Sequence, residues 1–478
     1  MKNNNATRTF AVLVSVFFFW GFVAASNDIL IPVFKDHLSL SQGKSQLIAF
    51  AFYVAYTVGS LIYIAMIKFF KFDLVKDLGY GKAIAVGLFV STIGTLLFIP
   101  AANMGSFGLV LAGLIIVGIG FSFQQTAANP FAILLGTPET GSQRLSMAGG
   151  INNLGTTIGP LLVSFAVFGR LGEGEAAVLD ITAVKIPYLI LGALFLIFGG
   201  IFWRLKTDSY EEEEISVAKD TAPQQSALSY PQLIMGMIAI FLYVGVEVAT
   251  AANLPEYLKS ELGYKTHEVA PFISLFWASL MIGRWTSAAS AFNVSDTRKT
   301  ALRVILPFAA FGIFLLVNIL ANKDITPFFP YVIMIAVMIV LDFLSKGNPA
   351  RQLLIYSGAG IVMLISGMFL GGTMGLFAFI SVGLFCSTLW PCIFTLSIKG
   401  LGKSTGQGSN FLIMMIMGGG FISVAQGSLS EIPSIGITQS FWVGVVCFAY
   451  LAFFAISAAR IFKQQGIIPL EIDKSAAH

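Results

Sequence analysis

The stretch that decides the fold is GSFGLVLAGLIIVGIGFSFQQTAANPFAIL, residues 105–134. It carries no charged residue, and roughly 20 apolar residues of helix suffice to cross the hydrocarbon core of a bilayer. Its second half, however, holds Gln124, Gln125 and Asn129, followed by Pro130. Such residues are costly in lipid unless they line a wet cavity or bond to a neighbouring helix. A long apolar helix with a cluster of amides indicates a membrane protein that handles a polar solute.

Apolar segments of this kind occupy most of the chain, which predicts an all-α membrane protein with 14 transmembrane helices. The segments are 10–33, 46–69, 82–101, 105–134, 144–169, 185–204, 231–258, 268–292, 299–320, 328–345, 352–370, 372–398, 408–429 and 438–462. The composition agrees, because 56% of residues are hydrophobic, 11% are charged and the mean hydropathy is +0.84. A soluble chain of this composition would expose large apolar patches.

The N-terminal segment resembles a signal peptide in one respect, since Lys2 and Arg8 precede an apolar run. The run continues from Phe10 to about Pro32 without a cleavage site of small residues, which is too long for a signal peptide. We therefore expect the first transmembrane helix here.

Composition also argues against several other functions. The net charge is only +4 and there is no basic run, so we expect no nucleic-acid partner. Cys386, Cys392 and Cys447 all lie in apolar segments without metal-binding spacing, so we expect neither a disulfide framework nor a bound cofactor. No pairing of a nucleophile with a base is visible, so we expect no enzyme.

The chain divides at a polar linker. Residues 1–205 form an expected bundle of six helices, residues 206–230 an acidic cytoplasmic linker that contains Glu211 to Glu214, and residues 231–478 the second bundle. A faint repeat relates 130–144 to 391–410 and supports two related halves. Two halves of six helices leave two in excess, and we assign these to an inserted hairpin, 299–345, which we expect to pack at the periphery.

The positions of basic residues predict the orientation, because short loops rich in lysine and arginine stay in the cytoplasm. With the N-terminus inside, every odd-numbered connection is extracellular and nearly all basic loops face the cytoplasm. These loops contain Lys68, Lys71, Lys76, Lys82, Arg144, Arg204, Lys206, Arg298, Lys299, Arg303, Lys346, Arg351, Lys399, Lys403, Arg460 and Lys463. We therefore expect both termini in the cytoplasm.

Polar residues in the first half mark a candidate substrate site. Asp28 lies near the outer end of its span, where a carboxylate costs at least about 2.5 kcal/mol unless it faces a wet cavity, a partner or the interface. Paired amides offer the donors and acceptors that sugar hydroxyls require. We expect the site to include Asn27, Asp28, Gln124, Gln125, Asn129, Asn152 and Asn153. The alternatives are an Asp28 side chain that only reaches the surface, and amides that only join helices.

The second half contributes three further candidates. Glu247 lies near the middle of its span, and Asn253 follows it by nearly two helical turns. A structural ion pair with Arg284, which we place at the end of the next span, is the alternative for Glu247. Trp390 with Pro391 interrupts the segment 372–398, and its ring offers a stacking platform for a sugar, although packing is the alternative.

Several motifs together resemble one family. They are Phe17-Phe18-Phe19-Trp20-Gly21, Asn27-Asp28-Ile29-Leu30-Ile31-Pro32, Gln124-Gln125-Thr126-Ala127-Ala128-Asn129-Pro130-Phe131, Arg144-Leu145-Ser146 with Asn152, and Trp390-Pro391 through Gly418-Gly419-Gly420. They resemble the fucose:proton symporter family of the major facilitator superfamily, over almost the whole chain except the linker and the 299–345 hairpin. Tyr243-Val244-Gly245-Val246-Glu247 is more similar to the glucose/galactose branch.

The resemblance implies roles for individual residues. Asp28 matches the acid of the first helix that the family uses for substrate and proton handling, and Asn152 matches an asparagine of the cavity. Gln125 stands where fucose-type members carry a proton-binding glutamate, and a glutamine does not titrate. Either Asp28 or Glu247 therefore takes the proton, or the coupling ion is sodium held at Asp28, which we favour at this point. We expect no other metal site.

The sequence as a whole predicts a monomeric symporter in the bacterial inner membrane. It would import a hexose such as glucose or galactose with sodium or protons, by rocking of the two halves around a midplane site. Symport of fucose or an N-acetylhexosamine with protons is one alternative. A drug exporter with fourteen helices is another, although its cavity would need fewer amides. A receptor is a third, but the linker is too short for a signalling domain.

Overall fold

The structure is a computed structural model that describes residues 2–37, 42–137, 140–168, 185–205, 226–264, 266–292 and 294–464. Within these ranges the side chains of residues 2–5, 24–37, 42–50, 160–168 and 266–268 are not described. The predicted linker therefore lies outside the described residues except for its last five positions.

The first group of helices runs from the N-terminus to residue 204. It comprises α1 (Lys2–His37), α2 (Gln42–Phe70), α3 (Leu74–Leu96), α4 (Phe98–Met104), α5 (Phe107–Leu134), α6 (Gly141–Phe168) and α7 (Lys185–Arg204). Side chains cap two of these helices, α3 and α5, where the backbone would otherwise lack partners. Asp73 Oδ1 accepts from Val75 N and Lys76 N at the start of α3, and Ser106 Oγ accepts from Leu109 N at the start of α5.

The second group follows from residue 227. It comprises η3 (Ala227–Ser229), α9 (Pro231–Ser260), α10 (Thr266–Ala288), η4 (Ala289–Ala291), α11 (Asp296–Leu320), η5 (Thr326–Tyr331), α12 (Val332–Ser345), α13 (Pro349–Leu370), α14 (Gly372–Cys386), α15 (Leu389–Ile398), η6 (Gly402–Ser404), α16 (Thr405–Met414), η7 (Met415–Met417), α17 (Gly418–Ser430), α18 (Gly436–Ser440) and α19 (Trp442–Gln464).

The predicted fold class is confirmed. In the described part of the chain, 12 helical segments are long and apolar enough to span a membrane. Two further long helices, α6 and α10, occupy the places of the predicted segments 144–169 and 268–292. Apolar runs become helices in lipid because no water is present to satisfy the backbone, and a helix satisfies it internally.

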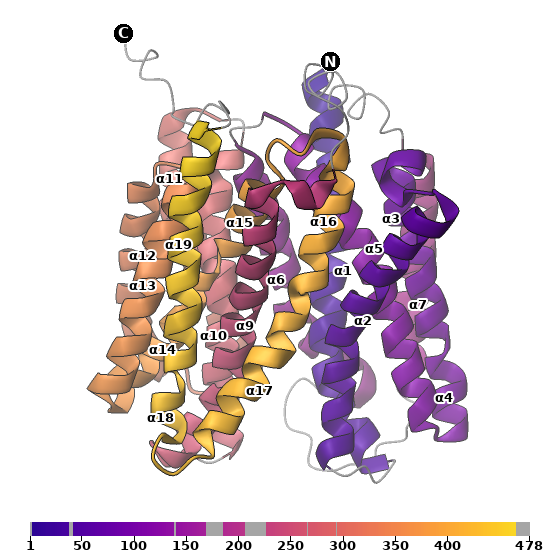
Figure 1. The fold of residues 1–478 in the computed structure, drawn as a ribbon. Coiled ribbons are helices and arrows are strands. Elements are labelled where there is room, and N and C mark those ends of the chain that lie inside the picture. The colour runs from indigo at the N-terminus through magenta and orange to yellow at the C-terminus, as the bar shows by residue number, and fades with distance from the viewer. Residues whose placement is uncertain are drawn as a thin grey trace.

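The two groups of helices stand side by side (Figure 1), with α1 beginning and α19 ending at the same end of the molecule. Within the first group, α1 packs chiefly on α6, and α3 on α5 and α7; within the second, α9 packs on α17 and α13 on α19. The groups meet mainly where α6 contacts α10 and where α16 contacts α2 and α5. The division at residues 205 and 231 remains a prediction.

One close crossing shows how glycine positions a polar helix. A Cβ atom at Gly21 of α1 would lie 1.9 Å from Asn152 O of α6, so only glycine permits this approach. The crossing lets Asn152 Nδ2 donate to Phe17 O at 2.9 Å. Small residues at such contacts are a common means of helix association in membranes.

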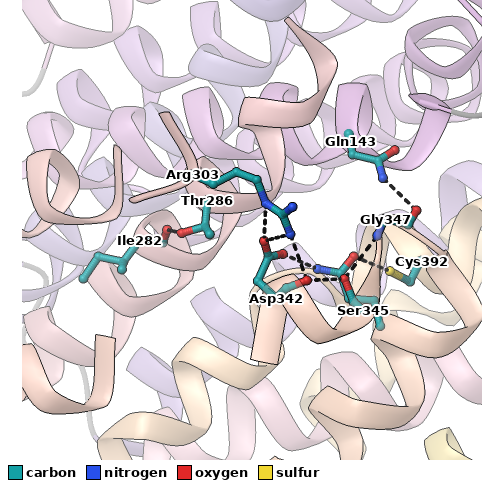
Figure 2. Close-up of polar contacts among 9 residues, drawn as sticks. Gln143, Ile282, Thr286, Arg303, Asp342, Ser345, Gly347 and Cys392 are labelled. Carbon is teal, nitrogen blue, oxygen red and sulfur yellow. Dashed lines mark hydrogen bonds and ion pairs between the residues drawn. The ribbon is translucent and has the colours of Figure 1, made fainter. Parts of the chain in front are cut away.

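The hairpin formed by α11 and α12 lies on the outer side of the second group in Figure 1. Its polar residues bond to each other and to α13. Arg303 Nε of α11 donates to Asp342 Oδ2 of α12 at 2.8 Å, and Gln352 Nε2 of α13 donates to Asp342 Oδ1 at 3.1 Å. Asp342 is only 2% exposed. Figure 2 shows this network. An ion pair thus joins the two helices of the expected peripheral hairpin, and the hydrogen bond from Gln352 connects the hairpin to α13.

The same network continues to the first group of helices. Cys392 Sγ of α15 donates to Gln352 Oε1 at 3.7 Å and lies 3.7 Å from Ser142 Oγ of α6. Beside it, Gln143 Nε2 donates to Gly347 O, in the turn between α12 and α13, at 2.9 Å (Figure 2). The hairpin and the start of α6 are therefore connected through one polar cluster.

Candidate functional site

Arg284 of α10 stands at the junction between the two groups of helices. Its guanidinium donates to Asn153 Oδ1 at 2.6 Å and to Gly149 O at 3.2 Å, both on α6. Asn153 lies 12 residues into α6, or about 18 Å along the helix, which is roughly the middle of a bilayer-spanning segment. Arg284 thus binds the first group of helices at about half the membrane depth.

A helix break gives Arg284 its third partner. The span 372–398 is interrupted between Cys386 and Leu389, as the proline predicted. Pro391 has no N–H, so the carbonyl four residues earlier, Ser387 O, loses its helical donor. Arg284 Nε donates to that oxygen at 2.9 Å. The break therefore creates an acceptor that a buried cation satisfies, as irregular backbone within a membrane requires.

Tyr243 connects Arg284 to Glu247. The Tyr243 hydroxyl donates to Glu247 Oε2 one turn along α9, and accepts from Arg284 Nη2 at 3.4 Å. The described ion pairs are Lys299 with Asp296 and Arg303 with Asp342. The alternative of a direct Glu247–Arg284 pair is therefore wrong in this structure, because the tyrosine stands between the two charges. Glu247 as a residue is half-buried.

Trp390 lies against this network. Its ring centroid is 6.2 Å from that of Tyr243 and 6.0 Å from that of Phe394, and the side chain remains partly exposed. Asn153, Tyr243, Glu247, Arg284 and Trp390 thus form one polar and aromatic cluster, which we call the junction cluster. It combines a carboxylate, a guanidinium and an aromatic face within one set of contacts.

The other predicted site residues in the first half of the chain differ in how far their side chains are exposed. Gln125 and Asn152 are half-buried, and Gln125 Nε2 donates to the Tyr56 hydroxyl at 3.1 Å. Gln124 is fully buried: its Oε1 accepts from Trp20 Nε1 at 2.8 Å and its Nε2 donates to Ser91 Oγ at 3.0 Å. Both polar ends of Gln124 are therefore engaged between α1, α3 and α5.

Two further amides are also buried. Asn129 is 1% exposed, and its Nδ2 has no hydrogen-bond partner among the described residues. Asn253 Nδ2 donates to Ala249 O of its own helix at 2.8 Å, and the residue is 8% exposed. No hydrogen bond in the described part of the chain connects Asn129 or Asn253 to the junction cluster. Asn27 and Asp28 belong to α1, but their side chains lie outside the described residues.

Sequence reasoning missed the central position of Arg284. The expected place of Arg284 at the end of its span is wrong, because α10 continues to Ala288 and η4 extends to Ala291, as the predicted segment 268–292 implies. Gly149 on α6 allows the arginine to lie flat on that helix, since a Cβ there would be 3.2 Å from Arg284 Cδ. The sequence did contain a signal, because Arg284 lies inside the predicted segment 268–292 and Gly149 and Gly150 lie in the predicted segment 144–169. It did not show that these two segments lie against each other.

Together these features define a multi-pass membrane protein whose two helical groups meet around buried polar residues. Residues 9–326 match the family model described as Major Facilitator Superfamily. The chain belongs to this superfamily of transporters.

Similar proteins place it more narrowly, in the branch that includes sugar transporters. The chain is 31% identical over 450 residues to a protein of Brucella abortus biovar 1 (strain 9-941) named "Glucose/galactose transporter", with 94% of this chain and 93% of that protein covered. It is 28% identical to the "L-fucose-proton symporter" of Escherichia coli (strain K12), over 93% of this chain and 92% of that protein.

A solved structure has a similar fold over nearly the full length. The crystal structure of the transporter FucP in the outward conformation matches with a TM-score of 0.71 and 25% identity, and covers 95% of this chain and 99% of that chain. The resemblance to the fucose:proton symporter family is confirmed.

Proposed function

We propose that this protein is a cation-coupled symporter that imports a hexose, glucose or galactose, by alternating access. The observation that carries the proposal is the junction cluster, in which Arg284 of one helical group hydrogen-bonds Asn153 of the other. Glu247 and Trp390 face the same contacts. A ligand that competes for these groups would change how the two groups are joined, which is what coupling of binding to rocking requires.

The sugar would contact the half-buried members of the site. Amide and carboxylate groups satisfy neighbouring hydroxyls in pairs, and an indole stacks on the apolar face of a pyranose. We assign these contacts to Gln125, Asn152, Glu247 and Trp390. Gln124 and Asn253 would support the site from behind, because their hydrogen bonds are made within the protein. Asn27, Asp28 and Asn129 remain proposed contacts on sequence grounds.

Glu247 is our candidate for the coupling cation, together with Asp28. A proton fits the described contacts of Glu247 better than sodium does. Its carboxylate accepts from a tyrosine hydroxyl and lies near the cationic Arg284, whereas sodium prefers several oxygen ligands and no adjacent cation. The Escherichia coli relative is named a proton symporter. No cofactor other than the coupling ion is required.

The protein would work as a monomer in the bacterial inner membrane, with both termini in the cytoplasm. In that orientation α16, which begins at Thr405 after the predicted cytoplasmic loop, joins the two groups through its contacts with α2 and α5. Ser60 Oγ donates to Asn410 O at 3.3 Å and Asn410 Nδ2 donates to Ser60 O at 3.2 Å across the two groups. We infer an outward-facing state, and transport rather than catalysis as the role of the buried polar residues.

A substitution in Asp28 tests the proposed coupling. Asp28→Asn removes a titratable group but preserves size, so it should abolish gradient-driven accumulation of labelled galactose in proteoliposomes and leave exchange across equal concentrations measurable. Asn27→Ala is a matched control on the same turn that should weaken sugar binding without uncoupling. Unimpaired uphill uptake by Asp28→Asn would remove this residue from the mechanism. Uptake of fucose but not of glucose or galactose would favour the alternative sugar.

A further inference from the structure

A second candidate site lies away from the junction cluster, beside the C-terminal end of α19 in the second helical group. A groove of about 530 Å³ is bounded by the start of α13, the end of α15 and the last turns of α19. Four of its lining residues are cations, Arg351, Lys399, Arg460 and Lys463. We call it the basic groove. The proposed sugar pathway does not use it.

Three of the four cations of the basic groove are available to a ligand. Arg351, Arg460 and Lys463 are exposed, and none of the three makes an ion pair with another described residue. Lys399 is half-buried, and its Nζ lies 5.1 Å from the centroid of the Phe462 ring. Burial lowers the pKa of Lys399, and a bound anion would offset that effect. Four such charges around one groove favour an anionic ligand.

The walls of the groove are apolar and continue into the surface that faces lipid. Leu354 is 39% exposed and Ile456 is 41% exposed, and both line the groove. On α19, Phe453 is 55% exposed and Val446 is 67% exposed. Residues 446, 453, 456 and 460 recur at helical spacing, so Arg460 ends an apolar stripe on one face of α19. The ligand should therefore have an anionic head and an apolar tail.

The position of the groove along α19 matches a lipid headgroup. Trp442, at the other end of this helix, is 43% exposed, and tryptophan favours the membrane interface. Arg460 lies 18 residues further, about 27 Å along the helix, which is close to the roughly 30 Å thickness of the hydrocarbon core. Arg460 therefore lies at headgroup level when Trp442 lies at the opposite interface.

We propose that the basic groove binds an anionic glycerophospholipid of the cytoplasmic leaflet, with its phosphodiester groups held by Arg351, Arg460 and Lys463 and an acyl chain along Ile456 and Phe453. Basic pockets between helices on this side of a membrane bind such headgroups. The apolar stripe distinguishes a lipid from a soluble phosphate, which has no tail to bury. Two phosphodiesters match several cations better than one, so a cardiolipin should bind more tightly than a phosphatidylglycerol.

The test uses the full-length protein in detergent and measures bound lipid by native mass spectrometry. Cardiolipin, phosphatidylglycerol and phosphatidylcholine are titrated against the parent, against R351Q/R460Q/K463Q, and against a control, K76Q/K82Q/R204Q. The control removes the same charge from exposed residues of the first helical group. Each cation near the membrane surface contributes roughly fivefold in affinity for anionic lipid. The groove variant should therefore lose roughly a hundredfold in cardiolipin affinity, and the control should bind as the parent does.

Several results would overturn the proposal. Equal losses in the groove variant and the control would show attraction by net charge alone. Displacement of cardiolipin by millimolar inorganic phosphate or glycerol phosphate would show that the groove holds a soluble anion. A many-fold gain in lipid binding on E471Q/D473N, or on neutralising Glu211 to Glu214, would show that an acidic segment of the chain fills the groove.

A measurement on the unaltered protein covers the case in which the groove variant does not fold. A cardiolipin with a photoactivatable acyl chain is added to the parent in phosphatidylcholine nanodiscs, irradiated, and the modified peptides are identified by mass spectrometry. Adducts should concentrate on residues 349–354 and 453–463. Adducts spread evenly over the lipid-facing helices would contradict a specific site.

Discussion

Replacing Asn153 by alanine should shift the protein away from the conformation described above. Asn153 Oδ1 accepts from Arg284 Nη1 at 2.6 Å, and the bond joins α6 to α10 across the two helical groups. A hydrogen bond to a charged group contributes about 1.5–3 kcal/mol. Loss of this amount from one state alone shifts the equilibrium between the two states by roughly 10-fold to 150-fold. The bond from Arg284 to Gly149 O remains, so the lower end of this range is expected.

Distances between spin labels measure this shift. Spin labels are attached to cysteines introduced in place of Lys82 and Lys403, which are both exposed. Their distance reports how far apart the two helical groups lie on the side of the molecule that contains the C-terminal end of α19. The three native cysteines are buried and should not react. Asn153→Ala should populate a second, longer distance that is minor in the parent.

The matched control is Thr157→Val, one turn further along α6. It loses only a hydrogen bond from Thr157 Oγ1 to Asn153 O, within the same helix, at 2.8 Å. Its distance distribution should match that of the parent. If Asn153→Ala also gives the distribution of the parent, the bond to Arg284 does not hold the two groups together and the reasoning is refuted.

Three further predictions concern single residues. Glu247→Gln should abolish uphill sugar uptake but retain exchange, measured with labelled sugar in proteoliposomes; retained accumulation would exclude Glu247 as the proton carrier. Gln124→Ala should leave the buried Trp20 N–H without its acceptor and cost about 1–3 kcal/mol. Its thermal unfolding midpoint should fall by several degrees while the sugar affinity of the folded protein changes less than for Gln125→Ala. Asp342→Asn should destabilise the protein by about 3 kcal/mol, the lower end of the range for buried pairs, because it leaves the partly buried Arg303 beside a neutral partner. The double change R303M/D342L should recover much of that loss, and equal instability of the double variant would argue against the ion pair as the cause.

The sequence was sufficient to predict the spans because lipid leaves the backbone few alternatives. Long runs without a charged residue, such as 105–134, form helices in lipid even where they contain amides, and α5 occupies 107–134 as expected. Pro391 likewise predicted the break before α15, since a proline always removes one helical hydrogen bond.

The direction in which each polar side chain points from its helix could not be predicted in the same way. Gln124 and Gln125 are adjacent and lie about 100° apart around α5, so only one can point to a given neighbour. In a helix with apolar residues on every side, no amphipathic pattern shows which amide faces the interior. The structure buries Gln124 against Trp20 and leaves Gln125 half-buried beside Tyr56.

The central place of Arg284 depends on contacts between distant parts of the chain. Its acceptors lie on α6 and in the break before α15, more than 100 residues away in either direction. The local sequence gives only an arginine in a moderately apolar segment. Tyr243 shows the same limit: it separates Arg284 from Glu247, and the alternative of a direct ion pair between those two residues rested on their charges alone.

Sugar uptake under defined gradients tests the proposed symport most directly. Proteoliposomes that contain the purified protein are given labelled glucose, galactose or fucose under an inward proton gradient, and separately under an inward sodium gradient. We predict accumulation of glucose or galactose above the external concentration with the proton gradient, and its loss in Glu247→Gln. Accumulation with sodium alone would contradict the assignment of the proton to Glu247, and no accumulation of any sugar under either gradient would contradict symport itself.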